Sequence, residues 1–287
     1  MQASWMTSTQ LGDLLQPTHG GVVPAIQLFE ESDSTNAEAL RQIKSRGAAG
    51  EFPPTAIIAR SQTAGRGRRG RSWMSEPDAG LYLSYVRSFP CAPDALQGLS
   101  LVVGLSVLSV LSELSTLQSL PAEAPIGLSL KWPNDILYQG RKLGGILLEL
   151  TLTGGNCVVV MGVGLNLKLP RGAEQALERP VADLGQVFAA SPPPQVLAAQ
   201  LLNRLGVDIA RFESGGFAPF VERWNLADAY RGRRVSLQQV AGQTEGISRG
   251  VDSTGGLLLE LPDGSLARFE GGELSGTLRL EEVAHDY

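Results

Sequence analysis

The sequence predicts an α+β protein in which helices face a central mixed sheet and a small all-β domain follows. Three observations carry this prediction. Apolar runs of strand length recur between residues 55 and 167, two longer apolar segments have the length of helices, and short strands separated by turn residues follow Trp224. The 287 residues are also enough to bury a substantial core.

The first expected helix lies in the segment STNAEALRQIKSRG, which begins at Ser34. Apolar residues recur near helical spacing along it, and Gly47 offers a stop. Thr35 and Glu38 fit the S/T-x-x-E pattern of a capping box, so one residue at this helix start is expected to cap it. The neighbouring short polar side chains are then available to a small polar ligand or an anion.

The other elements of the first domain follow from run length and turn residues. TAIIAR is a short apolar run and GLYLSYVRSF alternates, so both are strand candidates. IGLSLKW, GGILLELTL and CVVVMGVGLNL predict three more strands, separated by the turn formers PND and GGN. LSLVVGLSVLSVLSEL is long and apolar enough for a buried helix, although its periodicity alone does not separate a helix from a strand. From a triple proline onward, an amphipathic helix is expected over PPPQVLAAQLLNRLGVDIARFE.

The C-terminal part of the chain has a different pattern of apolar and turn residues. RRVSLQQV, TEGISRGV, GLLLEL and SLARFE are short strand candidates separated by AGQ, DSTGG and PDG, as in a small β-barrel or sandwich. The boundary falls between Leu226 and Tyr230. We therefore divide the chain into a lead-in over residues 1–27, expected to be loosely held, a first domain over 28–228 and a C-terminal domain over 229–287.

Composition excludes several classes of function. With a net charge of −5 the protein is not a general polyanion binder, so any basic site must be local. Cys91 and Cys157 are too few and too far apart in sequence for a disulfide scaffold or a thiolate zinc site. His19 and His285 lie near the two ends, which disfavours histidine-based catalysis and a histidine metal site. Since no leader pattern and no run of about 18 apolar residues stands out, we expect a cytoplasmic protein without a membrane span.

The stretch QTAGRGRRGRSW, residues 62–73, is the most informative part of the sequence. Its glycines spell G-x-G-x-x-G, but its four arginines do not suit the helix that follows a dinucleotide-binding turn, and no P-loop motif is present. A solvated basic turn and a nucleic-acid contact are two alternatives. Glycines alternating with arginines favour a third interpretation, in which backbone amides and guanidinium groups wrap a small phosphate.

Lysine is scarce, with four in the chain, which singles out Lys131 at the end of the apolar strand in LSLKWPND. An ammonium group there suits a carboxylate or an α-phosphate, although a strand-end lysine that reaches solvent is the ordinary alternative. Lys142, in QGRKLGG, is expected in an exposed turn. Asn166, in GVGLNL, is either a turn former at a strand end or an amide available to a ligand such as adenine.

Taken together, these motifs resemble those of the biotin protein ligases. DSTN, Q-x-x-GRGRRGR-x-W, KWPND, KLGGILLE, GVGLN and GISRGVDSTGGLLLE occur in this order between about Ser32 and about Arg279. The resemblance implies a class II synthetase-like biotin/lipoate ligase domain with a central mixed sheet, followed by an SH3-like C-terminal β-barrel. It also implies an enzyme that uses ATP and Mg²⁺ to form biotinyl-5′-AMP and then transfers biotin to a lysine of a carrier domain.

The resemblance implies a set of site residues as well. Biotin would be bound by the DSTN segment, the glutamine before the loop, the loop itself and the strand-end lysine, namely Ser34, Thr35, Asn36, Gln62, Arg66, Gly67, Arg68 and Lys131. ATP would be bound by Arg68, Arg71, Trp73, Lys131 and Asn166, and the expected catalytic residues are Arg68 and Lys131. No metal ligand is assigned. The segment from Arg171 to Pro194, where the family has a loop that closes over the adenylate, contains no motif that can be mapped.

The protein partner implied by the resemblance is the biotin carboxyl carrier protein of acetyl-CoA carboxylase. Many relatives carry an N-terminal DNA-binding domain of about 60 residues and repress biotin genes. About 27 residues precede the first domain here, so we expect no DNA binding. Both a monomer and a homodimer stay open. The alternatives are a lipoate–protein ligase, which would share the fold and the lysine, and a nucleic-acid-binding protein without enzymatic activity.

Overall fold

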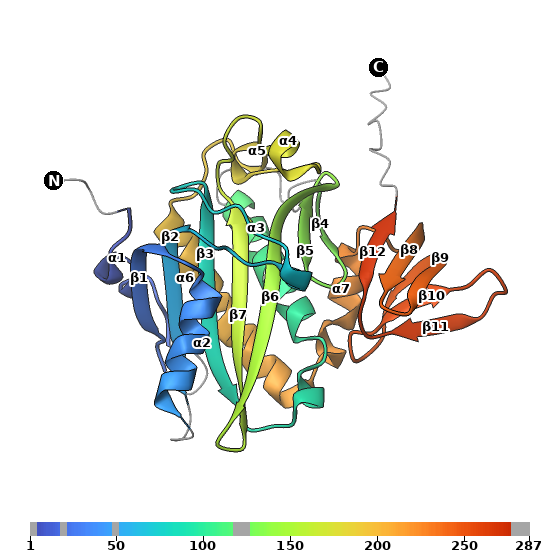
Figure 1. Cartoon of the computed structure of the whole chain (residues 1–287), viewed down its shortest axis with the longest axis horizontal. Helices are drawn as coiled ribbons and strands as arrows, with labels where there is room; N and C mark the ends of the chain where they lie inside the picture. Colours follow the sequence, from blue (N-terminus) through green and yellow to red (C-terminus); the bar gives the residue numbers. More distant parts are fainter. Residues whose placement is uncertain (1–4, 18–21, 48–51, 117–126, 277–287) are drawn as a thin grey trace.

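The centre of the molecule is a seven-stranded mixed sheet in the order β1-β2-β3-β7-β6-β5-β4 (Figure 1). The computed structural model describes residues 5–17, 22–47, 52–116 and 127–276. β1 and β2 are parallel and the other neighbouring strands are antiparallel. The strands are β1 (Ala25–Ser32), β2 (Thr55–Gln62), β3 (Gly80–Phe89), β4 (Leu128–Lys131), β5 (Asp135–Tyr138), β6 (Arg141–Thr153) and β7 (Asn156–Asn166).

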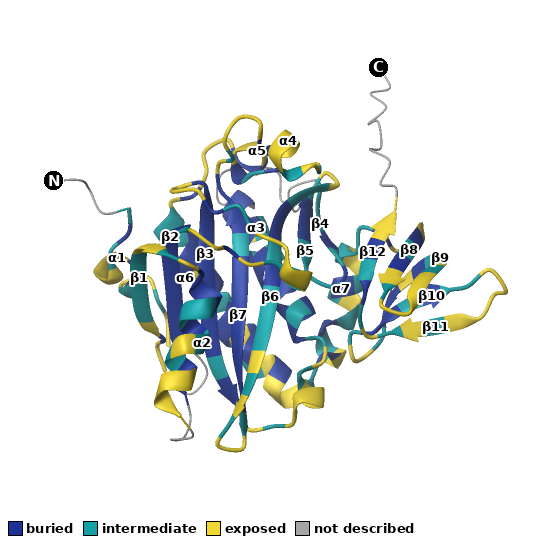
Figure 2. Cartoon of the chain, in the orientation of Figure 1, coloured by how far each residue is buried: buried dark blue, intermediate teal, exposed yellow. Residues whose placement is uncertain are grey.

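Helices cover both faces of this sheet. α2 (Thr35–Arg46) packs across β2, β3 and β7 on one face, whereas α3 (Leu99–Thr116) and α6 (Pro194–Gly215) pack together on the other (Figure 1). The larger core lies between the sheet and the α3–α6 pair, and a smaller core lies under α2 (Figure 2). The shorter helices are α1 (Ser8–Gly12), α4 (Ala173–Leu177), α5 (Leu184–Val187) and α7 (Val221–Ala227), with 3₁₀ turns η1 (Arg68–Gly70), η2 (Pro93–Leu96) and η3 (Ala218–Phe220).

α3 is apolar because it is a core helix. Among the described residues the segment Pro93–Ser115 is long and apolar enough to cross a membrane by composition, and 56% of its most apolar window is buried inside the protein. α3 packs on α6 and on β4, β5 and β6. Ser106 Oγ donates a hydrogen bond to the buried carboxylate of Asp208 on α6 (2.8 Å). The apolar surface of this helix is therefore used within the fold.

The C-terminal domain is a five-stranded antiparallel sheet in the order β11-β10-β9-β8-β12, compatible with an SH3-like fold. Its strands are β8 (Arg234–Gln239), β9 (Gly242–Val251), β10 (Leu257–Glu260), β11 (Leu266–Phe269) and β12 (Glu273–Gly276). Leu257 and Leu259 belong to the same apolar core as the first domain. Trp132 is buried at the junction, where its Nε1 donates to the carbonyl oxygen of Gly255 (3.1 Å). The C-terminal domain is thus attached beside the KWPND segment.

The central mixed sheet and the separate β domain confirm the expected fold class. β1, β5 and β12 were not predicted, because their runs are short or rich in polar residues. β5 begins at Asp135, inside the PND stretch assigned to a turn, and this residue pairs with Lys131 of β4. His19 and His285 lie outside the described residues.

One expectation about the start of the chain is wrong. The described part of the lead-in is packed rather than loose: Leu11 of α1 is fully buried, and the backbone N–H of Gln16 donates to Asn203 Oδ1 on α6 (2.8 Å). Cys91 and Cys157 are free thiols far apart in sequence but close in space, since Cys157 Sγ donates to the carbonyl oxygen of Cys91 (3.0 Å). Strand pairing of β3 with β7 brings them together.

Candidate active site

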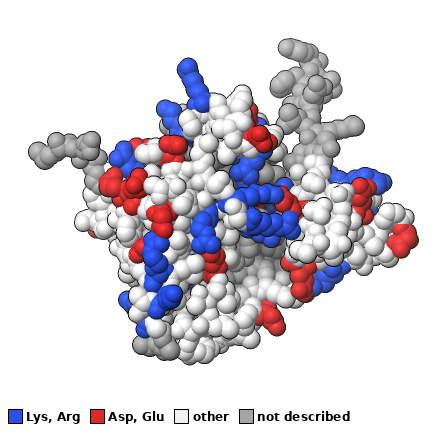
Figure 3. All heavy atoms as spheres, viewed as in Figure 1, with Lys and Arg blue, Asp and Glu red and all other residues white. Residues whose placement is uncertain are grey.

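A pocket of about 920 Å³, partly open to solvent, lies where both domains meet the N-terminal end of α2. It is lined by the glycine–arginine loop, β6, β7, the β4–β5 turn and the start of β12. Seven of the lining side chains are cationic and two are acidic, although the whole protein carries a net charge of −5. Figure 3 shows Lys and Arg side chains gathered around a hollow beside the C-terminal sheet. The chain therefore builds a local basic site on an acidic protein.

Ten of the eleven predicted site residues line this pocket. They are Ser34, Thr35, Asn36, Gln62, Arg66, Gly67, Arg68, Arg71, Trp73 and Lys131. The exception is Asn166, which is buried and whose Nδ2 donates to the carbonyl oxygens of Ala182 (2.9 Å) and Lys142 (3.3 Å). Its amide ties the end of β7 to the segment that follows α4. A contact between Asn166 and adenine stays a prediction.

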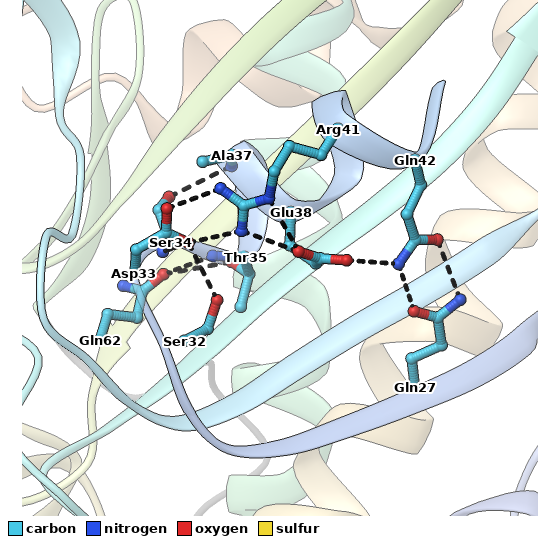
Figure 4. A network of polar contacts seen from close by, with 10 residues as sticks. All are labelled: Gln27, Ser32, Asp33, Ser34, Thr35, Ala37, Glu38, Arg41, Gln42 and Gln62. Atoms are coloured by element: carbon cyan, nitrogen blue, oxygen red, sulfur yellow. Dashed lines mark hydrogen bonds and ion pairs between the residues drawn. The ribbon is translucent and has the colours of Figure 1, made fainter. Parts of the chain in front are cut away.

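The start of α2 forms one wall of the pocket. Ser34 is the N-cap, and its Oγ accepts a hydrogen bond from the backbone N–H of Ala37 (3.4 Å; Figure 4). The predicted capping box of Thr35 and Glu38 is wrong, because Thr35 is already the first helical residue and Glu38 accepts hydrogen bonds from side chains of its own helix. The backbone N–H of Thr35 donates to Gln62 Oε1 (2.9 Å), which joins the helix to the end of β2 (Figure 4).

A buried polar network continues from this helix start to the glycine–arginine loop. Asn36 Nδ2 donates to Glu149 Oε2 (2.9 Å), and Asn36 Oδ1 lies 2.6 Å from Ser84 Oγ. The other oxygen of Glu149 pairs with Arg66 Nη2 (3.0 Å). A Cβ on Gly162 would lie 2.3 Å from Asn36 Oδ1, so a larger residue there would displace the Asn36 side chain. Glu149 thus connects Asn36, at the start of α2, to Arg66 of the glycine–arginine loop.

Two lysines meet at one carboxylate. Lys142 Nζ donates to Asp135 Oδ1 (2.5 Å), and Lys131 Nζ lies 3.9 Å from Asp135 Oδ2. The Lys142 side chain is 16% exposed, and its Nζ lies 5.5 Å from the ring centroid of Trp73. Burial lowers the pKa of Lys142, although Asp135 opposes this shift. The expectation that Lys142 lies in an exposed turn is wrong, because β6 begins at Arg141 and the neighbouring chain at Val181 covers it.

The loop arginines have different partners. Arg71 Nη2 pairs with Glu273 Oε2 of the C-terminal domain (2.5 Å), and Arg69 Nη1 lies 3.4 Å from the same oxygen. The hydrogen bond from Arg71 holds the pKa of Glu273 below its usual value. Arg68 forms no ion pair with any described residue, and its Nη1 donates to Asn134 Oδ1 (3.1 Å). Burial, and then the charge of Arg69, lower the pKa of Arg68. Arg68 is therefore positioned to meet an anionic ligand.

Comparisons with known proteins agree with this arrangement. The family described as Biotin/lipoate A/B protein ligase family matches residues 29–166, and the Biotin protein ligase C terminal domain matches residues 231–275. The chain is 36% identical to the bifunctional ligase/repressor BirA of Escherichia coli, over 91% of this chain and 76% of that protein. It is 34% identical to the biotin–[acetyl-CoA-carboxylase] ligase of Paracoccus denitrificans, over 83% of this chain and 95% of that protein. The chain belongs to the biotin protein ligase family.

A solved structure of this family has the same fold. The biotin protein ligase from Aquifex aeolicus in complex with biotin and ATP superimposes with a TM-score of 0.69 and 28% identity, over 88% of this chain and 98% of that chain. Membership in the biotin protein ligase family makes the protein an enzyme of the ligase class.

Several residues around the pocket were not assigned a role from the sequence. They are Asn134, Asp135, Lys142, Glu149, Arg179 and Glu273. Four of them belong to the biotin protein ligase motifs KWPND and KLGGILLE, so these motifs could have identified them from the sequence. Arg179 and Glu273 lie in no motif, and only the fold brings them to the site.

Proposed function

We propose that this pocket binds biotin and ATP side by side and that its cations stabilise the charge that develops between them. The chain is an ATP-dependent biotin ligase, which forms biotinyl-5′-AMP and transfers biotin to a lysine of a carrier domain. The observation that supports the site assignment is the presence of Lys131, Lys142 and Arg68 in one pocket whose nearby acid, Asp135, is shared by both lysines. Such a pocket has positive charge left for an anionic ligand.

The first step needs no general base from the protein. The carboxylate of biotin is ionised at neutral pH, so one of its oxygens attacks the α-phosphorus of ATP directly. A C–O–P linkage forms, the bond from the α-phosphorus to the bridging oxygen breaks, and its electron pair leaves with pyrophosphate. Catalysis is then a matter of positioning and charge neutralisation, which guanidinium and ammonium groups supply.

Lys142 joins the two predicted catalytic residues in this proposal. Its burial makes its charge effective, because an ammonium group shielded from water interacts more strongly with a phosphate. Asp135 holds its Nζ at 2.5 Å, and the Trp73 ring lies against it. Lys131 is more distant from the same carboxylate, at 3.9 Å. We assign Lys142 and Arg68 to the reacting phosphate and Lys131 to the neighbouring carboxylate or phosphate.

The polar wall at the start of α2 is suited to the uncharged end of biotin. Thr35 and Asn36 are buried and hydrogen-bonded. Gln62 connects Thr35 to Ser75, since its Oε1 accepts from the N–H of Thr35 (2.9 Å) and its Nε2 donates to Ser75 Oγ (2.8 Å). Amide and hydroxyl groups in fixed orientations match the donors and acceptors of a ureido ring. We therefore place the ring beside Ser34 and Asn36 and the carboxylate toward Lys142.

Mg²⁺ is proposed to enter with the nucleotide. Within the described residues no group of three or more His, Cys, Asp or Glu side chains could hold a metal ion. Mg²⁺ in nucleotide sites is commonly bound through substrate phosphates with one or two carboxylates. Asp135 and Glu273 line the pocket and would be the available carboxylates.

In the second step a lysine amine of the acceptor attacks the carbonyl carbon of biotinyl-5′-AMP. A C–N bond forms, the C–O bond to the phosphate breaks, AMP leaves with the electron pair, and the amine loses a proton to water. We propose the biotin carboxyl carrier protein of acetyl-CoA carboxylase as acceptor, since relatives that match most of this chain are named for that reaction. We place the reaction in the cytoplasm, where ATP is available. The absence of DNA binding and the oligomeric state stay predictions.

Intact-mass measurement of an acceptor domain tests the function. The protein, biotin, Mg²⁺-ATP and the acceptor are mixed, and we expect the acceptor to gain one biotinyl group while pyrophosphate is released. Replacing biotin by lipoate tests the alternative ligase. An acceptor that stays unmodified with biotin, with no pyrophosphate formed, would refute the proposal.

Variants of the cations test the site. Lys142→Ala or Arg68→Ala removes a charge-assisted contact, so we expect the rate of adenylate formation to fall about 10- to 100-fold with little change in melting temperature. Lys44→Ala is the matched control, because Lys44 is exposed in the last turn of α2. Parent rates in both site variants would overturn the residue assignment while leaving the function standing.

A further inference from the structure

We propose that Arg179 binds a phosphate group of the nucleotide beside Lys142. This inference rests on the proposed function and adds a residue from the segment between Arg171 and Pro194, which the sequence motifs leave unassigned. Arg179 follows α4 and lines the same pocket as Lys142 and Arg68.

Backbone hydrogen bonds hold Arg179 next to Lys142. The backbone N–H of Lys142 donates to the carbonyl oxygen of Pro180 (3.2 Å), and the N–H of Ala182 donates to the carbonyl oxygen of Lys142 (2.9 Å). Val181 forms an isolated parallel bridge with Lys142. Because two consecutive hydrogen bonds fix this register, the side chain that precedes Pro180 has a defined position at the pocket rather than that of a free loop.

The guanidinium group of half-buried Arg179 has a buried nitrogen without a partner among the residues that the structure describes. Its Nε is buried and forms no hydrogen bond, and within the described ranges no carboxylate pairs with it. Two acids of its own segment face backbone amides: Glu174 Oε1 accepts from the N–H of Val181 (3.2 Å), and Asp183 Oδ2 accepts from the N–H of Leu169 (2.9 Å). The third, Glu178, is exposed and forms no ion pair with Arg179. An unsatisfied buried donor is costly, so a ligand atom is its natural partner.

The positive charge of Lys142 beside Arg179 indicates that this ligand atom is anionic. Lys142 is also cationic, and the charge of Arg179 disfavours the ammonium form of Lys142, in addition to the larger effect of burial on its pKa. Asp135 already pairs with Lys142, but no described carboxylate pairs with Arg179, so an anion that binds between the two cations would relieve their remaining repulsion. A phosphate offers several oxygens to such a pair, and a planar guanidinium group can donate to two of them. Biotin brings one carboxylate, whereas ATP brings three phosphates, so we assign Arg179 to the nucleotide.

Steady-state kinetics of Arg179→Gln test the assignment. Pyrophosphate release is measured with ATP and with biotin varied in turn, and inhibition by adenosine, which has no phosphate, is measured in parallel. We expect the KM for ATP to rise at least about 10-fold, since a charge-assisted contact is lost. The KM for biotin and the inhibition constant of adenosine are expected to stay within about 2-fold of the parent values, which a general distortion of the pocket would not allow.

Two further variants complete the design. Arg179→Lys keeps the charge but not the forked geometry, so we expect a smaller rise in the KM for ATP. Arg171→Gln removes an exposed arginine from the same segment outside the pocket and should behave like the parent. An unchanged KM for ATP in Arg179→Gln, or equal losses for ATP, biotin and adenosine, would overturn this inference. A parent protein that releases no pyrophosphate would instead refute the proposed function itself.

Discussion

Asp228 makes the stability of this protein depend on pH. Its carboxyl lies at the junction of the two domains, where the backbone of Asp228 bridges to Leu130 and the N–H of Ala229 donates to the carbonyl oxygen of Leu130 (2.9 Å). Oδ1 accepts a hydrogen bond from the N–H of Tyr230 (2.9 Å), whereas Oδ2 is buried without a partner among the described residues. Burial raises the pKa of Asp228 from 3.8 to about 6. The ionised form is therefore disfavoured in the folded state.

The size and sign of the effect follow from this shift. A group whose pKa is raised by folding gives its full stabilisation below its unfolded pKa and loses it as the pH rises through its folded pKa. A shift of about 2 units corresponds to at most about 3 kcal/mol. Between about pH 5 and about pH 7.5, the part of the window that is easily reached, the loss is about 1.4 kcal/mol. Asp228→Asn has no charge to lose, so it should lack this component.

Urea unfolding of the parent and Asp228→Asn at these two pH values measures the component. We expect the difference between their free energies of unfolding to change by about 1.4 kcal/mol in favour of the variant at the higher pH. Asp94→Asn, which removes an exposed carboxylate from η2, is the control for a simple change in net charge. A difference that stays constant with pH would refute the view that Asp228 is a buried acid with a raised pKa.

Three more substitutions probe the site. Glu149→Gln removes the charge that pairs with Arg66 at 3.0 Å, so we expect trypsin to cleave the loop faster and the KM for biotin to rise several-fold; unchanged cleavage would contradict the pairing. Gly164→Ala places a Cβ 2.7 Å from Trp73 Cε2 and so displaces the indole ring. We expect urea unfolding to show about 1–3 kcal/mol lower stability, and we expect a higher KM for ATP. An unchanged KM for ATP would show that the Trp73 indole does not contribute to nucleotide binding. Glu273→Gln removes a carboxylate from partly exposed ion pairs, so its stability should change by less than about 1 kcal/mol. The added positive charge of the pocket should lower the KM for ATP at low salt, and this effect should shrink near 1 M NaCl; a rise in the KM, or a change that persists at high salt, would contradict this electrostatic explanation.

The sequence by itself determined the elements with a strong local pattern. β3 occupies the alternating segment Gly80–Phe89 as predicted, and α6 occupies Pro194–Gly215 after the triple proline. These predictions succeed because alternation, helical spacing and proline act over neighbouring residues. Short strands such as β5 failed for the converse reason, since four residues with a polar start carry too little pattern.

The candidate site was likewise predicted only in part from the sequence. The composition of the loop and the isolation of Lys131 in an apolar strand predicted a cationic site from local chemistry. The tertiary structure decided which cations are paired within the protein, because several of their partners are distant in sequence. Arg66 pairs with Glu149, Arg71 pairs with Glu273, and the ammonium group of Lys142 lies over the ring of Trp73. The charge of a side chain can be read from the sequence, but its burial and its ion pairs depend on the packed fold. The sequence alone therefore identified cationic side chains without showing which of them are paired within the protein.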